Sequence, residues 1–438
     1  MKKIITFFLT AAILSSCLPQ NMQVPQSPLL PLLERKSGLI AYIGADWNIY
    51  TSDQAGKNIT AYTKDAVLPK TAGDPFHYYV YPTWSPDSES IGFVGVSGQG
   101  TQSSADVYIA TVEEEGAKKV FSSDSEHPFY LYWSPDNTNL GFLSSTSDGQ
   151  TMVLQSVSSE SKDRTIIDTG SPYYWSWAPD GKTMIVHTGS TQTSVPEHLA
   201  FLKVGSDITE DGLDASPVSF QSPAWSPDGS RILMTRVNDQ KKNEIIITDG
   251  KGKYEKTVGT FDLNTGFAWS NHSDMVAYIE GKKTIGAGVL GTLHVVDSET
   301  SKELFKDDED VFAFFWSPNA SKIAYFIPKL ASGSASSSGQ SDSSAQAQQL
   351  LLTLKILDVK TGESKELFTF QPTDQFAAIL PYFDQYAQSA TIWSPDNNNL
   401  VLSFIANDGA SGIAVVAASG QLEPRLLTPG YLAFWSRK

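Results

Sequence analysis

The sequence predicts an all-β chain folded as a β-propeller, and three observations support this prediction. A turn motif that begins with tryptophan recurs along the chain, its period is close to that of one four-stranded blade, and the two ends of the chain carry complementary parts of one unit. The 438 residues are 40% hydrophobic and 18% charged, which provides apolar material for a large core.

The motif reads Trp-Ser-Pro-Asp in its fullest form. Its eight occurrences start at Trp84, Trp133, Trp177, Trp225, Trp269, Trp316, Trp393 and Trp435. They are separated by 49, 44, 48, 44, 47, 77 and 42 residues, and a period in the forties matches a propeller blade. Ser, Pro and Asp suit successive positions of a tight turn, so we expect the recurring aspartates to form turns rather than a binding site.

Short β-rich runs follow each motif and predict four strands per unit. Residues 39–43, 47–51 and 57–60 read as three strands that lack a first one, while residues 431–436 read as a first strand alone. Pairing the C-terminal strand with this N-terminal unit closes the ring and buries edges that would otherwise invite aggregation. The count is then eight blades. Seven is the alternative, because the unit at Trp177 has the least clear fourth strand, between Ser206 and Phe220.

The N-terminus has the features of an export signal, with lysines at positions 2 and 3, an apolar run from Ile4 to Leu14, and small residues before Cys17. Residues 14–17 resemble a bacterial lipobox, which implies a signal peptide over 1–16 and lipid attachment to the Cys17 thiol. Four prolines in residues 17–37 predict an extended tether. We therefore expect a protein anchored to a bacterial membrane on its extracytoplasmic side.

The repeats over roughly residues 38–438 resemble the WD40-like, or PD40, repeats of TolB-type propellers and of the non-catalytic propellers in prolyl-oligopeptidase and dipeptidyl-peptidase relatives. The resemblance rests on the Trp-Ser-Pro-Asp-Gly turn and implies a fold rather than an activity. TolB carries a further α/β domain and the peptidases a hydrolase domain, and we expect neither here.

The formal net charge of −16 disfavours nucleic acid as a partner, because phosphate binding needs clustered Lys and Arg. We expect a monomeric propeller without a cofactor, whose partners are the membrane and an envelope protein, peptide or glycan.

The 77-residue interval between Trp316 and Trp393 predicts two insertions in the propeller. Residues 331–349 form a low-complexity Ser, Gly, Ala and Gln tract. Residues 373–389 have apolar side chains at helical spacing, and Pro381 favours two short segments over one helix. Both insertions are expected on one loop face, where propellers commonly bind ligands.

Aromatic residues before the motif tryptophans and in the second insertion are the binding candidates, with burial between blades as the alternative role. The candidates are Tyr78, Tyr130, Tyr174, Tyr431, Phe376, Tyr382, Phe383 and Tyr386.

Motifs for catalysis are scarce, and His77 and His127 are the weak candidates for a metal site, which would need further ligands. No metal site and no catalytic residue is predicted. The sequence therefore favours a non-catalytic binding or scaffold propeller that presents one loop face. The alternative is a hydrolase or polysaccharide lyase with a site at the mouth of the axial channel around these histidines.

Overall fold

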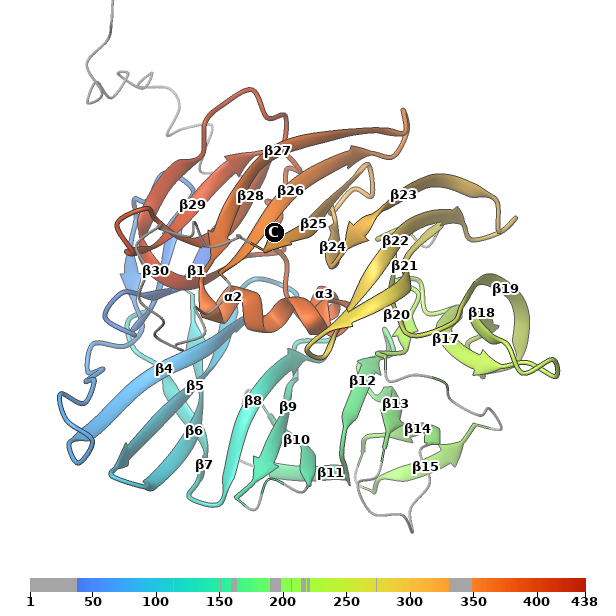
Figure 1. The fold of residues 1–438 in the computed structure, drawn as a ribbon. Helices are drawn as coiled ribbons and strands as arrows, with labels where there is room; N and C mark the ends of the chain where they lie inside the picture. The colour runs from blue at the N-terminus through green and yellow to red at the C-terminus, as the bar shows by residue number, and fades with distance from the viewer. Residues whose placement is uncertain are drawn as a thin grey trace, which may run out of the picture.

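A computed structural model describes residues 38–438, apart from 113, 148, 150, 159–163, 190–197, 206, 214–217, 219–220, 273 and 331–348. Antiparallel sheets surround a short helical segment (Figure 1). Cys17, the predicted signal peptide and tether, and residues 331–348 of the first insertion lie outside the described residues. Among the helices of the described ranges, none is long and apolar enough to cross a membrane.

Five sheets of the described chain hold four strands each. They are β4–β7 (Pro75–Trp84, Ser90–Gln99, Gln102–Thr111, Lys118–Ser123), β8–β11 (Glu126–Trp133, Asn139–Thr146, Met152–Ser158, Arg164–Gly170), β12–β15 (Tyr173–Trp177, Thr183–Thr188, His198–Lys203, Thr209–Gly212), β16–β19 (Ala224–Trp225, Arg231–Val237, Asn243–Asp249, Tyr254–Phe261) and β20–β23 (Thr265–Trp269, Met275–Ile285, Gly288–Asp297, Glu303–Val311). The fourth strand of the Trp177 unit is therefore β15, which pairs with β14.

The remaining strands form one ten-stranded sheet in the order β24-β25-β26-β27-β28-β29-β30-β1-β2-β3. Their bounds are β24 Ala313–Trp316, β25 Lys322–Leu330, β26 Leu350–Asp358, β27 Glu363–Pro372, β28 Asn399–Ile405, β29 Ser411–Ala417, β30 Arg425–Trp435, β1 Leu39–Gly44, β2 Ile49–Asp53 and β3 Thr60–Ala61. The sheet is continuous because β27 pairs with β28 through two residues, and because β30 pairs with β29 by its first half and with β1 by its second.

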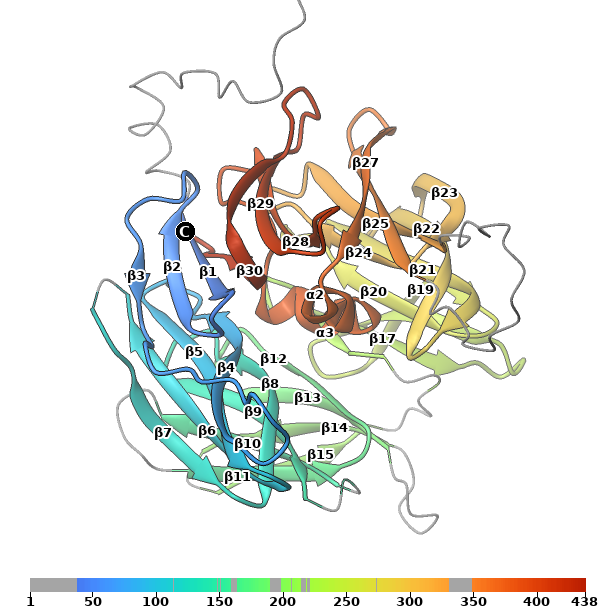
Figure 2. The same cartoon turned by 60° about the vertical axis from the view of Figure 1, so that its left-hand side comes forward.

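The predicted closure of the ring is confirmed. The C-terminal strand β30 pairs antiparallel with β1, with Ile40 opposite Trp435 and Tyr42 opposite Ala433, and both ribbon views place the two strands side by side (Figure 2). The all-β propeller class is confirmed as well. The blade count of eight, or seven, stays a prediction, because several predicted units share the ten-stranded sheet.

The repeated turn is held by its own serine and aspartate. In four repeats the Ser Oγ donates to the Asp Oδ1 two residues later at 2.5–2.6 Å, at Ser85, Ser134, Ser226 and Ser394. The same Oγ accepts from the backbone N–H five residues on, as from Arg231 to Ser226 at 3.0 Å. The aspartates thus act as turn formers.

The motif tryptophans connect each repeat to the one before it. Trp133 Nε1 donates to the carbonyl of Thr83, the residue just before Trp84, at 3.3 Å. The same bond recurs from Trp84 to Phe434, Trp177 to Tyr132, Trp269 to Ala224, Trp316 to Ala268 and Trp393 to Phe315, at 3.0–3.4 Å. The bond from Trp84 to Phe434 links the first motif to the C-terminal strand and so joins the ends of the chain.

Trp225 is the exception. Its indole Nε1 is buried without a hydrogen-bond partner among the described residues, and only its backbone N–H reaches back, to Ser176 Oγ at 3.3 Å. Its strand β16 is two residues long. The junction between the Trp177 and Trp225 repeats therefore lacks the indole bond that six other motif tryptophans make.

Residues 373–389 form a plug across the axis rather than a surface lid. The segment consists of α2 (Asp374–Ile379), a 3-10 turn η1 (Leu380–Tyr382) that contains Pro381, and α3 (Phe383–Ser389). Thr373 caps α2 by accepting from Phe376 N at 3.2 Å. The plug lies inside the ring of sheets, where α3 contacts β8, β12, β20 and β24 (Figures 1 and 2).

Polar contacts fix α3 in place. Gln385 Nε2 donates to Tyr130 Oη and to the Trp175 carbonyl, both at 2.9 Å, and its Oε1 accepts from Trp175 N at 3.2 Å. Asp384 Oδ2 accepts from Ser222 N at 3.0 Å. Because Asp384 is only 6% exposed, burial raises the pKa of its carboxyl to about 6, although the backbone N–H groups of Ser222 and Gln385 favour the charged form.

The indole hydrogen bonds between repeats predict that two equivalent tryptophans contribute differently to the stability of the fold. We expect Trp393→Phe to lower the free energy of unfolding by about 1–3 kcal/mol more than Trp225→Phe does, because only the first change removes a hydrogen bond between repeats. Urea unfolding followed by circular dichroism measures both. Equal losses would show that the indole bond contributes nothing beyond ring packing.

The buried carboxyl predicts a pH dependence of stability. Burial raises the pKa of Asp384 in the folded state to about 6 from 3.8. The contribution of Asp384 to the free energy of unfolding is therefore most favourable below pH 3.8 and is lost as the pH rises through 6. We expect Asp384→Asn to reduce the fall in unfolding free energy between pH 4 and 7.5 by about 2–3 kcal/mol.

The control is Asp228→Asn. Hydrogen bonding from Ser226 lowers the pKa of Asp228, so its contribution is instead lost as the pH falls. If wild type and Asp384→Asn lose stability equally over this pH range, Asp384 does not titrate as the burial predicts.

Candidate functional site

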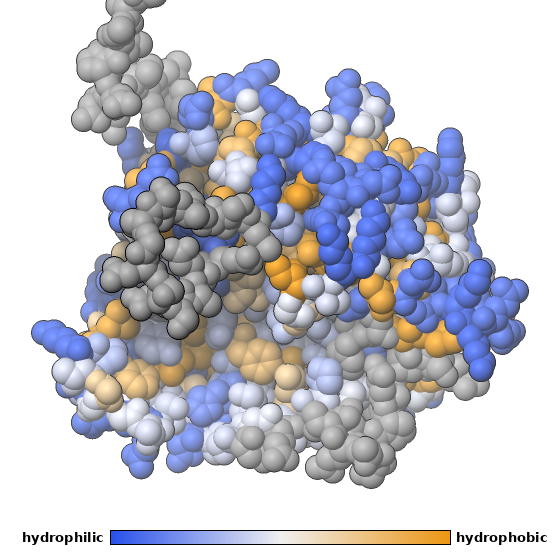
Figure 3. Space-filling model, in the orientation of Figure 1, coloured by the Kyte–Doolittle hydropathy of each residue, from blue (hydrophilic) through white to orange (hydrophobic). Residues whose placement is uncertain are grey.

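One side of the plug borders a cavity of about 740 Å³. Its floor comes from α2, η1 and α3, and its walls from β1, β4, β8, β9, β10, β12, β30 and the loops that adjoin them. In Figure 3, apolar surface gathers in a recess near the centre of this face. The cavity has the size of a small-ligand or peptide-side-chain site.

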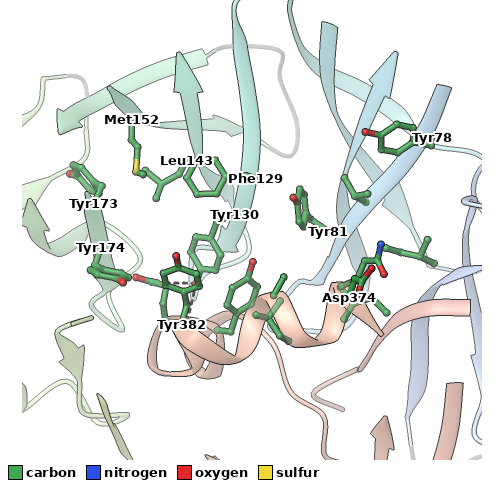
Figure 4. Close-up of a pocket in the computed structure, with 18 of the residues that line it drawn as sticks. Tyr78, Tyr81, Phe129, Tyr130, Leu143, Met152, Tyr173, Tyr174, Asp374 and Tyr382 are labelled. Atoms are coloured by element: carbon green, nitrogen blue, oxygen red, sulfur yellow. Dashed lines mark hydrogen bonds between the residues drawn. The ribbon is translucent and has the colours of Figure 1, made fainter. Parts of the chain in front are cut away.

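Five of the eight predicted binding residues line this cavity: Tyr78, Tyr130, Tyr174, Tyr382 and Tyr386. Figure 4 shows Tyr78 on β4, Tyr130 on β8 and Tyr174 on β12 facing the helical segment that carries Tyr382. Tyr130 is a wall residue and is only 4% exposed, since its hydroxyl donates to the Gln385 carbonyl at 2.9 Å. The structure thus brings together aromatic residues from three sheets and the plug.

The other three candidates have different positions. Phe376 and Phe383 are 0% and 1% exposed and lie in the core rather than at the cavity surface. Phe383 packs on Phe314 with ring centroids 4.7 Å apart, on the opposite side of the plug from the cavity. Tyr431 does not line the cavity but stacks at 4.4 Å on Trp47, which does.

Trp47, Tyr81, Phe129 and Tyr173 also line the cavity and were absent from the predicted set. Two of them lie at β-bulges. The register of β4 against β5 shifts between Val80 and Thr83, and Tyr81 has a positive φ of 57°. The register of β8 against β9 shifts between Pro128 and Tyr130, around Phe129.

A bulge re-aims a side chain that regular alternation would direct elsewhere. The signal in the sequence is proline inside a strand, Pro82 after Tyr81 and Pro128 before Phe129, because proline cannot donate to the strand ladder.

Several polar groups of the cavity are available to a ligand. Within the described residues, the hydroxyls of Tyr78, Tyr81, Tyr382 and Tyr386 have no hydrogen-bond partner. Burial raises the pKa of Tyr78, Tyr81 and Tyr386, so these phenols are neutral at pH 7 and can donate or accept. Asp374, the first residue of α2, also lines the cavity and is exposed.

The plug separates this cavity from a second one of about 420 Å³ on the face that carries the repeated turns. Gln385 and Tyr386 face the first cavity, while Asp384, Ala387 and Gln388 face the second. Since α3 lines both, the axis is divided rather than open from face to face.

The two candidate histidines make separate hydrogen bonds. His77 Nδ1 lies 2.6 Å from Ser97 Oγ and its Nε2 lies 2.7 Å from Tyr79 Oη, whereas His127 Nε2 lies 2.9 Å from Ser103 Oγ. Across the described ranges, no group of three His, Cys, Asp or Glu side chains is placed to hold a metal ion. The histidines therefore do not form one shared site.

Comparison with known proteins places the chain by its repeats. A family model described as the TolB beta propeller domain (PD40) matches residues 45–320, more than half of the chain. No curated protein matches the sequence significantly.

Solved structures with a similar fold share little sequence with the chain. A eukaryotic initiation factor is 13% identical, with a TM-score of 0.48, and the match covers 92% of this chain and 99% of that one. An oligogalacturonate lyase in complex with manganese is 12% identical, with a TM-score of 0.47 and coverages of 87% and 98%. TolB from Acinetobacter baumannii is 12% identical, with a TM-score of 0.39 and coverages of 96% and 88%.

The likeness to these solved structures concerns the fold and carries no functional argument. The repeats, the antiparallel sheets and the family match agree, and the chain belongs to the TolB β-propeller (PD40) family.

Proposed function

We propose that the chain is a binding propeller of the bacterial cell envelope, and that it recognises a peptide segment of a partner protein in the 740 Å³ cavity. The observation that carries this proposal is the concentration of aromatic side chains at one end of the axis, held by three sheets and the plug. Such a preformed apolar cavity with few polar groups is typical of a ligand site.

Rigidity of the walls supports binding rather than core packing as the role of these side chains. The Tyr130 and Tyr173 hydroxyls are occupied by Gln385 and Asp168, which fixes their rings. Positions already ordered before binding lose little conformational entropy when a ligand arrives. The hydrolase or lyase alternative has less support, because His77 and His127 are bonded to different partners.

The proposed binding in the cavity is best tested by a single substitution that fills the cavity. Deletion of residues 373–389 would be less informative, because it would also remove four buried apolar side chains: Phe376, Ile379, Leu380 and Phe383. Ala378 is exposed and lines the cavity, so Ala378→Trp fills space without disturbing the core. We expect affinity capture from cell-envelope extracts, quantified by mass spectrometry, to recover a partner with wild type and to lose at least about 90% of it with this variant.

Ala410→Trp is the matched control, because Ala410 is exposed on the loop between β28 and β29 and does not line the cavity. It should capture the partner as wild type does. Identical capture by all three proteins, or capture of no partner by any, would overturn the proposed function.

The envelope location rests on the N-terminal sequence and on the family. We propose that Cys17 carries the lipid that attaches the chain to the membrane. Wild type should then require detergent for extraction from the membrane fraction, whereas Cys17→Ser should be released without it. An unchanged distribution between fractions would rule out anchoring through this thiol.

A further inference from the structure

If the cavity binds a ligand, as proposed above, the charge of its lining residues indicates the chemical class of that ligand. Asp374 is the one charged side chain among the described residues that line it, and neither Lys, Arg nor His lines it. Asp374 makes no hydrogen bond or ion pair to another described side chain. The cavity therefore presents an unpaired carboxylate beside aromatic walls.

Aromatic rings add to this negative potential, because the face of each ring carries the negative part of its quadrupole. Figure 4 shows Asp374 on the same side of the cavity as Tyr78 and Tyr81. Trp47 meets Tyr78 edge-on at 5.5 Å and stacks on Tyr431 at 4.4 Å, so an aromatic cluster lies at the cavity that Asp374 also lines. Cations bind over such rings within about 6 Å of the centroid.

We propose that this cavity recognises an organic cation on an apolar stem, an ammonium or guanidinium group whose charge is paired with Asp374 and whose stem lies on Trp47, Tyr78 and Tyr81. A lysine or arginine side chain of a peptide and a free amine share this chemistry. An anion would be repelled by Asp374. A neutral glycan could donate hydroxyl hydrogen bonds to the carboxylate but would supply no counter-charge.

Four unpaired phenols complete the match. The hydroxyls of Tyr78, Tyr81, Tyr382 and Tyr386 can accept from the N–H groups of an ammonium or guanidinium. Burial keeps Tyr78, Tyr81 and Tyr386 protonated, so they add acceptors without adding charge. A single positive charge on the ligand therefore suffices.

The test uses isothermal titration of the full-length protein with three probes. The first is the N-acetylated, C-amidated peptide Gly-Phe-Lys-Phe-Gly, the second has norleucine in place of lysine, and the third is phenethylamine. We expect the lysine peptide to bind about tenfold more tightly than the norleucine peptide. Asp374→Asn should remove most of this preference, while Asp262→Asn, which changes an exposed carboxylate outside the cavity, should keep it.

Phenethylamine distinguishes the source of the cation. Binding as tight as that of the lysine peptide supports a free amine as ligand, and much weaker binding supports a side chain presented by a peptide. A thermal melt of Asp374→Asn verifies that the variant is folded; if it is not, Asp374→Ser provides the same loss of charge.

Two outcomes overturn the inference and leave the proposed function standing. They are equal binding of the two peptides by wild type, and a lysine preference that survives the loss of the Asp374 charge. If no probe binds, the cation inference also fails, and the capture experiment with Ala378→Trp decides separately whether the cavity binds a partner.

Discussion

The ring depends on a hydrogen bond that six of the eight motif indoles donate to the carbonyl of the residue before the preceding motif tryptophan. It joins neighbouring repeats at the same residue pair each time, so the innermost strands are held at a repeating distance. The Ser and Asp of the motif support this contact, because their hydrogen bonds hold the turn that directly follows the tryptophan. At Trp225 this bond is missing.

A ring fixed in this way leaves space along its axis, and residues 373–389 occupy it. The side chains that face the plug differ in chemistry between the two sides of the ring. On the β20 and β24 side, Phe314 packs directly on Phe383, and Gly266 leaves room for the same ring, since a Cβ there would lie 2.7 Å from it. On the β4, β8 and β12 side, the facing residues are mostly tyrosines, and the cavity lies between them and the plug.

Much of the architecture could be predicted from the sequence because it repeats. The turn motif and the aromatic segments before the motif tryptophans occur several times. The strands of the closing unit are divided between the two ends of the chain. The site was only partly predictable, since it depends on departures from the repeat. Tyr81 and Phe129 reach the cavity through β-bulges next to prolines. Prediction from sequence assumes that side chains alternate between the two faces of a strand, and a bulge interrupts this alternation.

The burial of Phe376 and Phe383 could not be predicted for a related reason. Helical spacing shows that a segment has an apolar face, but it does not show whether that face meets solvent, a ligand or the core. Here the plug is enclosed by the ring, so its phenylalanines are buried against β20, β24 and β25 while its tyrosines face the cavity.

The distinction between Phe and Tyr along the plug is therefore the best local signal of which face stays open. A phenol buried without a partner costs free energy that a phenylalanine does not. Tyr382 and Tyr386 avoid that cost because they line the cavity, where water or a ligand can reach their hydroxyls.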